Sequence, residues 1–168
     1  MVAITTHMGL KRIAAGLLAA VWLLAAQAQD TKAVDDLMAQ ANKAMQKGQP
    51  RDAENLLRKA IDAAPNRSDL YALRARARDS SGKFDAALED ANKYIELEPK
   101  DAYGYLTRSR IYISLDKPEM ALADANKAIE LEPNEPDGYY RRSDIYREMD
   151  KNAEAKADEK KAEELEKR

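Results

Sequence analysis

ANKYIELEPKDAYGYLTRSRIY, residues 91–112, is followed 34 residues later by ANKAIELEPNEPDGYYRRSDIY, residues 125–146. The two stretches are identical at 14 of 22 aligned positions, and the alignment needs no gap. Chains that repeat a segment at a period of roughly 20 to 50 residues stack copies of one supersecondary unit. The sequence therefore predicts a fold built from a repeated unit of 34 residues.

The same period of 34 residues extends beyond these two stretches. Proline, a small residue and tyrosine each recur in register, and Gly48 and Gly82 continue as Asp116 and Asp150. The recurrent positions are Pro65, Pro99 and Pro133; Ala53, Ala87, Ala121 and Ala155; and Tyr71, Tyr105 and Tyr139. One helix pair cannot bury its own apolar face, so each unit is expected to bury it against its neighbours.

Each unit is predicted to contain two helices joined by a turn. In the second unit the helices are expected over residues 69–80 and 84–98, with the turn at Gly82. Glycine adopts positive φ without steric cost, and Asp is one of the few other residues that tolerates it. The residue before a proline is pushed out of helical geometry, so Pro99 is expected to close the unit. Asp116 and Glu119 have the spacing of a capping box, which predicts Asp116 as the N-cap of the following helix.

A charged pair also recurs with the period. An Arg and an Asp stand 16 residues apart in the second, third and fourth units, whereas the first unit has Gln40 and Leu56 in their places. The pairs are Arg74 and Asp90, Arg108 and Asp124, and Arg142 and Asp158. Joint presence and joint absence predict a bidentate bridge between the two helices of each unit. The alternative is that both side chains are solvated and contribute little.

This pattern resembles the tetratricopeptide repeat family. Besides the positions above, the resemblance rests on small residues and further aromatics, namely Ala75, Ser109, Ser143, Tyr112 and Tyr146. It implies an all-α fold, a right-handed α-solenoid of about four helix-turn-helix repeats, at 34–67, 68–101, 102–135 and 136–168. The first unit departs from the family pattern at Leu37 and Ala44, and Arg78 stands where an aromatic is usual.

The segment before the repeats has the three parts of a secretory signal peptide. Lys11 and Arg12 precede an uncharged apolar run over residues 13–25, and Ala26-Gln27-Ala28 provides an Ala-x-Ala cleavage site. The run is shorter than the about 20 residues that a membrane-spanning helix needs. We predict cleavage after residue 28, a short segment at 29–33, and export to a bacterial periplasm. The alternatives are an uncleaved anchor in the inner membrane, facing the periplasm, and a buried first helix.

The composition of residues 29–168 excludes several kinds of site. Its net charge is 26 − 30 = −4 with the signs intermixed, which gives no nucleic-acid footprint. The chain has no Cys, and its only His, His7, precedes the cleavage site. The sequence has no Gly-rich phosphate loop and no metal-binding spacing. We therefore predict no enzyme, cofactor, metal or small-molecule substrate; a hydrolase that uses two carboxylates is a remaining alternative.

In tetratricopeptide-like folds the first helix of each pair lines a concave groove, and the resemblance carries this groove over to this chain. The residues that it places there are Asn42, Arg76, Tyr103, Arg110, Tyr140, Arg141 and Asp144. Aromatic side chains with Arg are typical of interface hot spots, so the expected partner is a protein or peptide with acidic groups. The family's Lys/Asn clamp for a chaperone carboxylate is absent, because only Asn42 matches it.

Two functions follow from these patterns. The first is an exported scaffold or adaptor that binds its partner through the concave groove without catalysis. The second is a membrane-tethered assembly subunit of an envelope complex, in which the N-terminal helix is not cleaved and contacts the membrane. The mass of the exported protein distinguishes them, because loss of residues 1–28 favours the first.

Overall fold

A computed structural model describes residues 31–167, and the predicted signal peptide lies outside these residues. The described chain is entirely helical and contains no strand, as expected for the all-α class. Its first helix covers residues 31–46. The others are α2 (Pro50–Ala63), α3 (Ser68–Ser80), α4 (Phe84–Leu97), α5 (Ala102–Ser114), α6 (Pro118–Leu131), α7 (Pro136–Glu148) and α8 (Asn152–Glu166). We refer to the four consecutive helix pairs as the first to fourth units.

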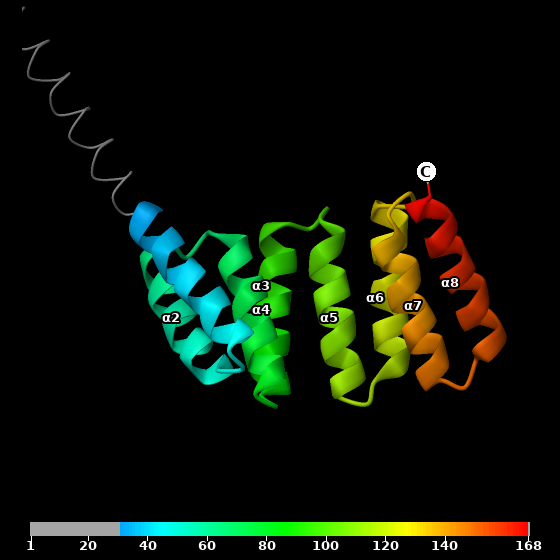
Figure 1. The fold of residues 1–168 in the computed structure, drawn as a ribbon, viewed down its shortest axis with the longest axis horizontal. Coiled ribbons are helices and arrows are strands. Elements are labelled where there is room, and N and C mark those ends of the chain that lie inside the picture. The colour runs from blue at the N-terminus through cyan, green and yellow to red at the C-terminus, as the bar shows by residue number, and fades with distance from the viewer. Residues whose placement is uncertain (1–30, 168) are drawn as a thin grey trace, which may run out of the picture.

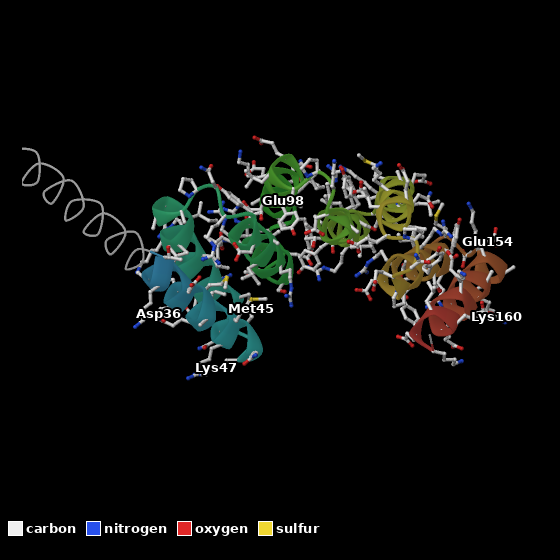
Figure 2. All side chains as sticks on the ribbon, turned by 90° about the horizontal axis from the view of Figure 1, so that it is seen from above. Asp36, Met45, Lys47, Glu98, Glu154 and Lys160 are labelled. Atoms are coloured by element: carbon white, nitrogen blue, oxygen red, sulfur yellow. The ribbon has the colours of Figure 1, made fainter. Side chains whose placement is uncertain are left out.

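The units form a single curved row. Figure 1 shows the helices side by side in chain order, and Figure 2 shows the row bent into an arc with residues 31–46 and α8 at its ends. Helix α5 contacts both α3 and α7, whereas α4 and α6 do not contact each other. The odd-numbered helices therefore lie closer together and form the inner, concave side of the arc.

The four turns inside the units share one backbone conformation. Gly48, Gly82, Asp116 and Asp150 have positive φ, at 69°, 73°, 56° and 59°. In the third unit, Asp116 N donates to Ile113 O and Lys117 N donates to Tyr112 O, both at 2.9 Å. These two bonds define a Schellman motif, which satisfies the last carbonyl groups of the helix. The recurrence of glycine and Asp in the sequence thus has a backbone cause.

The predicted capping box at Asp116 is wrong. The N-cap of α6 is Lys117, and no side chain caps this helix end. Asp116 belongs instead to the end of α5, where its left-handed conformation closes the Schellman motif. The residues before the three recurrent prolines behave as predicted, because α4 ends at Leu97 and Glu98 is no longer helical.

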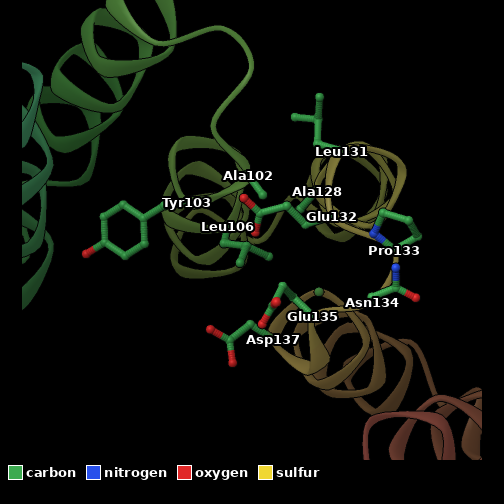
Figure 3. Close-up of a pocket in the computed structure, with 11 residues that line it drawn as sticks. Ala102, Tyr103, Leu106, Ala128, Leu131, Glu132, Pro133, Asn134, Glu135 and Asp137 are labelled. Atoms are coloured by element: carbon green, nitrogen blue, oxygen red, sulfur yellow. The ribbon is translucent and has the colours of Figure 1, made fainter. Parts of the chain in front are cut away.

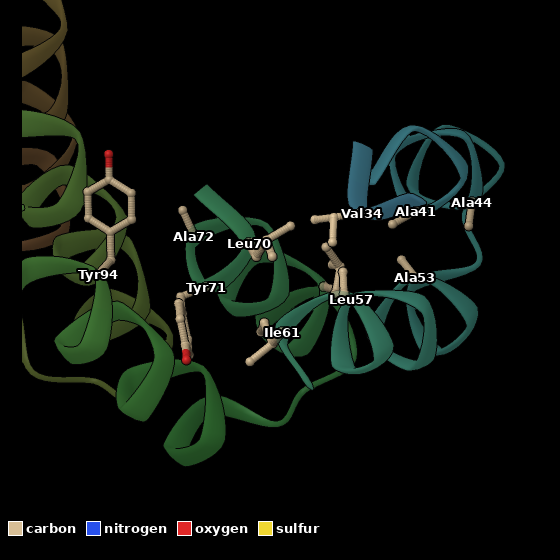
Figure 4. Packing of buried hydrophobic residues seen from close by; sticks show 12 residues of the cluster. Val34, Ala41, Ala44, Ala53, Leu57, Ile61, Leu70, Tyr71, Ala72 and Tyr94 are labelled. Atoms are coloured by element: carbon tan, nitrogen blue, oxygen red, sulfur yellow. The ribbon is translucent and has the colours of Figure 1, made fainter. Parts of the chain in front are cut away.

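The core is thin and depends on small residues where the two helices of a unit cross. Ala53, Ala87 and Ala121 are fully buried, and Ala155 is 1% exposed. Larger apolar side chains fill the space between the first two units, where Val34, Leu57 and Leu70 pack together (Figure 4). A larger side chain at the alanine positions would push the helices of a unit apart.

Candidate functional site

The three predicted Arg–Asp pairs are in contact and hold the two helices of their units together. Each Arg donates from Nε and Nη2 to both carboxylate oxygens of its Asp, at 2.7 to 2.8 Å. Asp90, Asp124 and Asp158 are buried, with 3%, 6% and 7% exposure. The bonds raise the pKa of the arginines, of which Arg108 is an example, and burial of the guanidinium opposes this change. These three arginines are therefore occupied within the fold.

Two of these arginines, together with the recurrent tyrosines, also form contacts that connect a unit to the one before it. Arg108 Nη1 donates to Asn92 Oδ1 at 2.8 Å, and Arg142 Nη1 donates to Asn126 Oδ1 at 2.7 Å. The recurrent tyrosines donate to the carbonyls of Pro65, Pro99 and Pro133, at 2.9, 3.1 and 3.1 Å. The two Asn residues also stand 34 residues apart, so the sequence carried a signal for these contacts that the pairing analysis missed.

Arg78 has a structural role that the sequence did not reveal. It stands where Tyr112 and Tyr146 occur in the next two units, and it reaches in two directions. Its Nη1 donates to Asp90 Oδ2 at 3.0 Å, and its Nε donates to Glu54 Oε1 of the first unit at 3.1 Å. Arg78 is therefore also occupied by the fold, although it lies in an arginine-rich stretch of α3 that resembles an anion site.

Five of the seven residues expected in the groove line one hollow on the concave side. This hollow, which we call the arginine hollow, has a volume of about 290 Å³ and lies between α5 and α7. The five predicted residues in its lining are Tyr103, Arg110, Tyr140, Arg141 and Asp144. Leu106, Thr107 and Asp137 complete it. Asn42 and Arg76 lie on the first helix and on α3, and the structure does not bring them into this hollow.

The arginines of this region differ in their partners. Arg110 Nε donates to Asp79 Oδ2 at 3.1 Å, and Ser114 Oγ donates to the other oxygen of the same carboxylate. Arg147 forms ion pairs with Asp144 and Glu159, at 2.9 and 2.8 Å. Asp79 has no counterpart at its position in the other units, so the period gave no signal for this contact.

Arg141 is the exception. Its Nε is buried and has no hydrogen-bond partner among residues 31–167. Burial lowers the pKa of Arg141, the nearby charge of Arg110 lowers it further, and Asp144 acts in the opposite direction. An arginine remains charged at any physiological pH. Asp137 and Asp79 act on this charge in the same direction as Asp144. The arginine hollow therefore contains a partly desolvated guanidinium with acidic side chains nearby, and its Nε donates no hydrogen bond to any group of the described residues.

Two aromatic side chains line the same hollow as this charge. Tyr103 is 42% exposed and packs edge-on against Tyr94, with 5.9 Å between the ring centroids. Tyr140 donates its hydroxyl to Glu166 Oε2 at 3.1 Å, and the pKa of Tyr140 is raised by desolvation and by this bond. An exposed ring and a half-buried guanidinium in one hollow suit an extended segment of another chain.

A larger hollow lies beside the first. It has a volume of about 560 Å³, lies between α5, α6 and the start of α7, and is shown in Figure 3. We call it the acidic hollow because Glu132, Glu135 and Asp137 line it, together with apolar side chains such as Leu106 and Ala128. The two hollows share Tyr103, Leu106 and Asp137. Apart from Tyr103, its lining residues are not among those predicted for the groove.

Two other features of residues 31–167 concern membranes and metals. None of the helices in this range is both long and apolar enough to cross a membrane. The range also contains no group of three His, Cys, Asp or Glu side chains arranged to hold a metal ion.

Comparison with protein families and solved structures gives a consistent picture. A family model described as tetratricopeptide repeat matches residues 44–111, and a second model of the same description matches residues 102–135 and 136–168. Among curated proteins, the Protein SGT1 homolog of Oryza sativa subsp. japonica is 41% identical over 69 residues. That match covers 41% of this chain and 19% of the rice protein, so it spans about a fifth of that relative's length.

Solved structures resemble most of the described chain. A thermophilic TPR protein of Thermus thermophilus is 21% identical with a TM-score of 0.74, covering 80% of this chain and 75% of that one. MamA is 24% identical with a TM-score of 0.68, covering 80% of this chain and 78% of that one. The first TPR of Spaghetti (RPAP3), bound to the HSP90 peptide SRMEEVD, is 27% identical with a TM-score of 0.64, covering 70% and 94%.

Proposed function

This chain belongs to the tetratricopeptide repeat family, and we propose that it is a non-catalytic scaffold whose concave groove binds an acidic segment of a protein or peptide. The similar TPR of Spaghetti (RPAP3) holds a peptide, SRMEEVD, that carries acidic residues. That observation concerns another protein, so the residues of this chain must carry the argument.

The proposal rests mainly on the unpaired Nε of Arg141. Arg141 is half-buried, and its Nε has no acceptor among the described residues, so the desolvation of this atom is not offset by a hydrogen bond. Its equivalents in the other units are Ala39, Leu73 and Thr107, so the repeat architecture does not require a cation at this position. A carboxylate from a partner would supply the missing acceptor, and a charge-assisted bond of this kind is stronger than a neutral one.

The neighbours of Arg141 support an extended ligand. Tyr103 offers an exposed ring on one side of the arginine hollow, and Tyr140 lies in its wall. Arg110 retains its ion pair with Asp79 while its charge adds to the positive field around Arg141. A segment with one acidic side chain flanked by apolar or aromatic residues fits these groups. The fourth unit thus supplies the charge and the third unit supplies the exposed aromatic ring.

The test is a selection of displayed random peptides on the purified protein, followed by fluorescence anisotropy with the best peptide. We expect acidic peptides to be enriched, and Arg141→Gln to weaken their binding by about tenfold or more. Arg58→Gln, an exposed site on α2, is the charge-matched control and should bind as wild type does. Failure to select any peptide, or unchanged affinity in Arg141→Gln, would refute the proposal.

The same variant has a second expected property. Because Arg141 Nε has no partner among the described residues, Arg141→Gln should leave the free energy of unfolding unchanged or raise it by about 1 kcal/mol. Urea unfolding of wild type and variant measures this difference. A marked loss of stability would instead assign Arg141 a role within the fold.

We also propose that residues 1–28 direct export, most consistently to a bacterial periplasm. Support comes from the sequence alone, namely Lys11 and Arg12, the apolar run and the Ala-x-Ala site. Expression in a bacterium with mass spectrometry of the periplasmic fraction tests this, and the expected product begins at Gln29. A product that keeps its full mass in the membrane fraction would favour the tethered assembly subunit.

A further inference from the structure

The acidic hollow arises from one difference between equivalent positions of the repeat. Tyr94 of the second unit and Ala128 of the third stand 34 residues apart. Tyr94 is 7% exposed and packs in the core with Tyr71 and Ala72, and its ring lies against Gly104 of the next unit. Ala128, which is 1% exposed, has only a methyl group at the corresponding position, and it lines the acidic hollow.

The carboxylates of the hollow are also unlike their equivalents. In the second unit Glu98 accepts from Ser68 Oγ at 3.3 Å, and Asp101 accepts from the Tyr94 hydroxyl and from Tyr103 N. Glu132 and Glu135 take these positions in the third repeat, 102–135. Within residues 31–167, neither of their carboxylates, nor that of Asp137, forms a hydrogen bond or an ion pair with another side chain. Asp137 lies within the electrostatic influence of Arg141, whereas Glu132 and Glu135 have no cationic partner among the described residues.

The shape and the charge of the hollow indicate one kind of occupant. Its apolar lining consists mainly of the half-buried Leu106, with the buried Ala102 and Ala128 beneath, and the Leu106 side chain suits a chain of methylene groups. Figure 3 shows Glu132 extending toward α5, with Glu135 and Asp137 close to one another at the start of α7. A long side chain with a terminal positive charge places its stem on the floor and its head among the carboxylates. A purely apolar side chain would leave the acidic rim without a partner.

We propose that the acidic hollow binds a lysine or arginine side chain of the segment that occupies the concave groove. The proposal rests on the proposed function, because that segment would place its acidic residue at Arg141. The two hollows share Tyr103, Leu106 and Asp137, so one short segment reaches both. The preferred partner then carries both a basic and an acidic residue, not acidic residues alone.

The test uses single amino acid probes, so it does not depend on knowing the partner. The purified protein, labelled with ¹⁵N, is titrated with N-acetyl-lysine methylamide, and N-acetyl-norleucine methylamide is the uncharged match. We expect the lysine probe to shift the amide signals of Leu106, Ala128 and Gly138, with an affinity roughly fivefold or more above that of norleucine. Added salt should reduce this difference, because it screens exposed charges.

Two variants locate the site. Ala128→Tyr fills the hollow as Tyr94 does in the preceding unit and should abolish the shifts. The triple variant Glu132→Gln, Glu135→Gln, Asp137→Asn changes only exposed side chains, so it should fold and should reduce lysine affinity to that of norleucine. Equal binding of both probes to wild type, no shift in the hollow, or unchanged lysine binding in the triple variant would overturn this inference.

The outcome is separable from that of the proposed function. Binding of an acidic peptide that depends on Arg141 is read by anisotropy, and occupation of the acidic hollow is read by the lysine probe. If the peptide binds but the lysine probe does not, the groove function stands and the basic subsite is wrong. If the lysine probe binds but no peptide is selected, the function at Arg141 is wrong.

Discussion

At the joint between the second and third units, Tyr94 fills the space between neighbouring helices and donates its hydroxyl to Asp101, the N-cap of α5. At the joint between the third and fourth units, the equivalent residues are Ala128 and Glu135, and a hollow of about 560 Å³ is left open. Arg110 and Asp79 form an ion pair across the first joint, whereas Arg141 of the fourth unit has an unpaired Nε among the described residues.

From the difference between the two joints we infer that one repeat sequence can serve either the stability of the stack or the binding of a partner. In a solenoid each unit contacts only its neighbours, so a joint can be loosened without changing the others. The closed joint uses its aromatic and charged residues to stabilise the stack. At the open joint the equivalents of Tyr94 and Asp79 are Ala128 and Ile113, and both candidate binding hollows lie there. We therefore expect variants of the closed joint to affect stability, and variants of the open joint to affect binding.

The strongest way to break the comparison is to open the closed joint. Tyr94→Ala removes a buried aromatic ring, and we expect the free energy of unfolding to fall by about 3 kcal/mol or more. Tyr94→Phe removes only the hydroxyl that bonds Asp101 and should lose about 1 kcal/mol. Urea unfolding followed by circular dichroism measures both. If the two variants lose the same amount, the ring does not close this joint.

A second experiment asks whether the units themselves, apart from their joints, are equivalent. Asp124→Ala leaves the partly buried guanidinium of Arg108 without its carboxylate and should destabilise the protein by about 3 kcal/mol. Arg108→Ala should have an effect of similar size, and the double variant should lose much less than the sum. Additive losses would show that the pair does not bridge the helices of the third unit, and the comparison of joints would then need a different basis.

A matched pair of glycines tests the packing of the two joints directly. A Cβ at position 104 would lie 2.6 Å from the Tyr94 ring and 2.9 Å from Ile95, whereas one at position 138 would lie 2.7 Å from Ile129 Cγ1 and 3.4 Å from the Ile129 backbone nitrogen. Alanine favours a helix over glycine by about 1 kcal/mol. We expect Gly104→Ala to lose about 1 to 2 kcal/mol and Gly138→Ala to stay within about 0.5 kcal/mol of wild type. Thermal unfolding compares them, and equal losses would contradict the difference in packing.

The smallest expected effect concerns two equivalent serines. Ser109 Oγ donates to Ala121 O at 3.0 Å, whereas Ser143 Oγ is buried without a hydrogen-bond partner among the described residues. Ser109→Ala should therefore destabilise by about 1 kcal/mol, and Ser143→Ala should be neutral or stabilising. Chemical unfolding with precise midpoints measures this. A loss of stability in both variants would mean that the Ser143 hydroxyl, like that of Ser109, forms a stabilising hydrogen bond.

The period of the sequence predicted most of the fold. Recurrent prolines, glycines and alanines specify where helices end, turn and cross, and these depend on local sterics that a single residue type reveals. The Arg–Asp pairs were predictable for the same reason, because three copies in register report one contact. Asp116 was misplaced as an N-cap because its role in the turn and a capping role both favour the same residue type.

The candidate site was less predictable, because it depends on departures from the period. Asp79 contacts Arg110 across a joint with no repeated counterpart, and Ala128 opens a hollow only because its equivalent is Tyr94. When a residue type occurs in only one repeat, a single sequence contains no second copy with which its role can be compared. The sequence placed Arg141 on the groove side, but only the structure shows that its Nε is buried without a partner among residues 31–167.

The contacts of Arg108 have a consequence for how such a chain can grow. Its guanidinium reaches Asp124, 16 residues ahead, and Asn92, 16 residues behind, and Arg142 repeats both contacts with Asp158 and Asn126. A duplicate of residues 102–135 inserted after residue 135 would bring its own Asp and find the Asn that it needs in the original copy. Each added repeat would form the same contacts with the repeat before it, so the arc can lengthen in whole steps of 34 residues without requiring a new kind of contact.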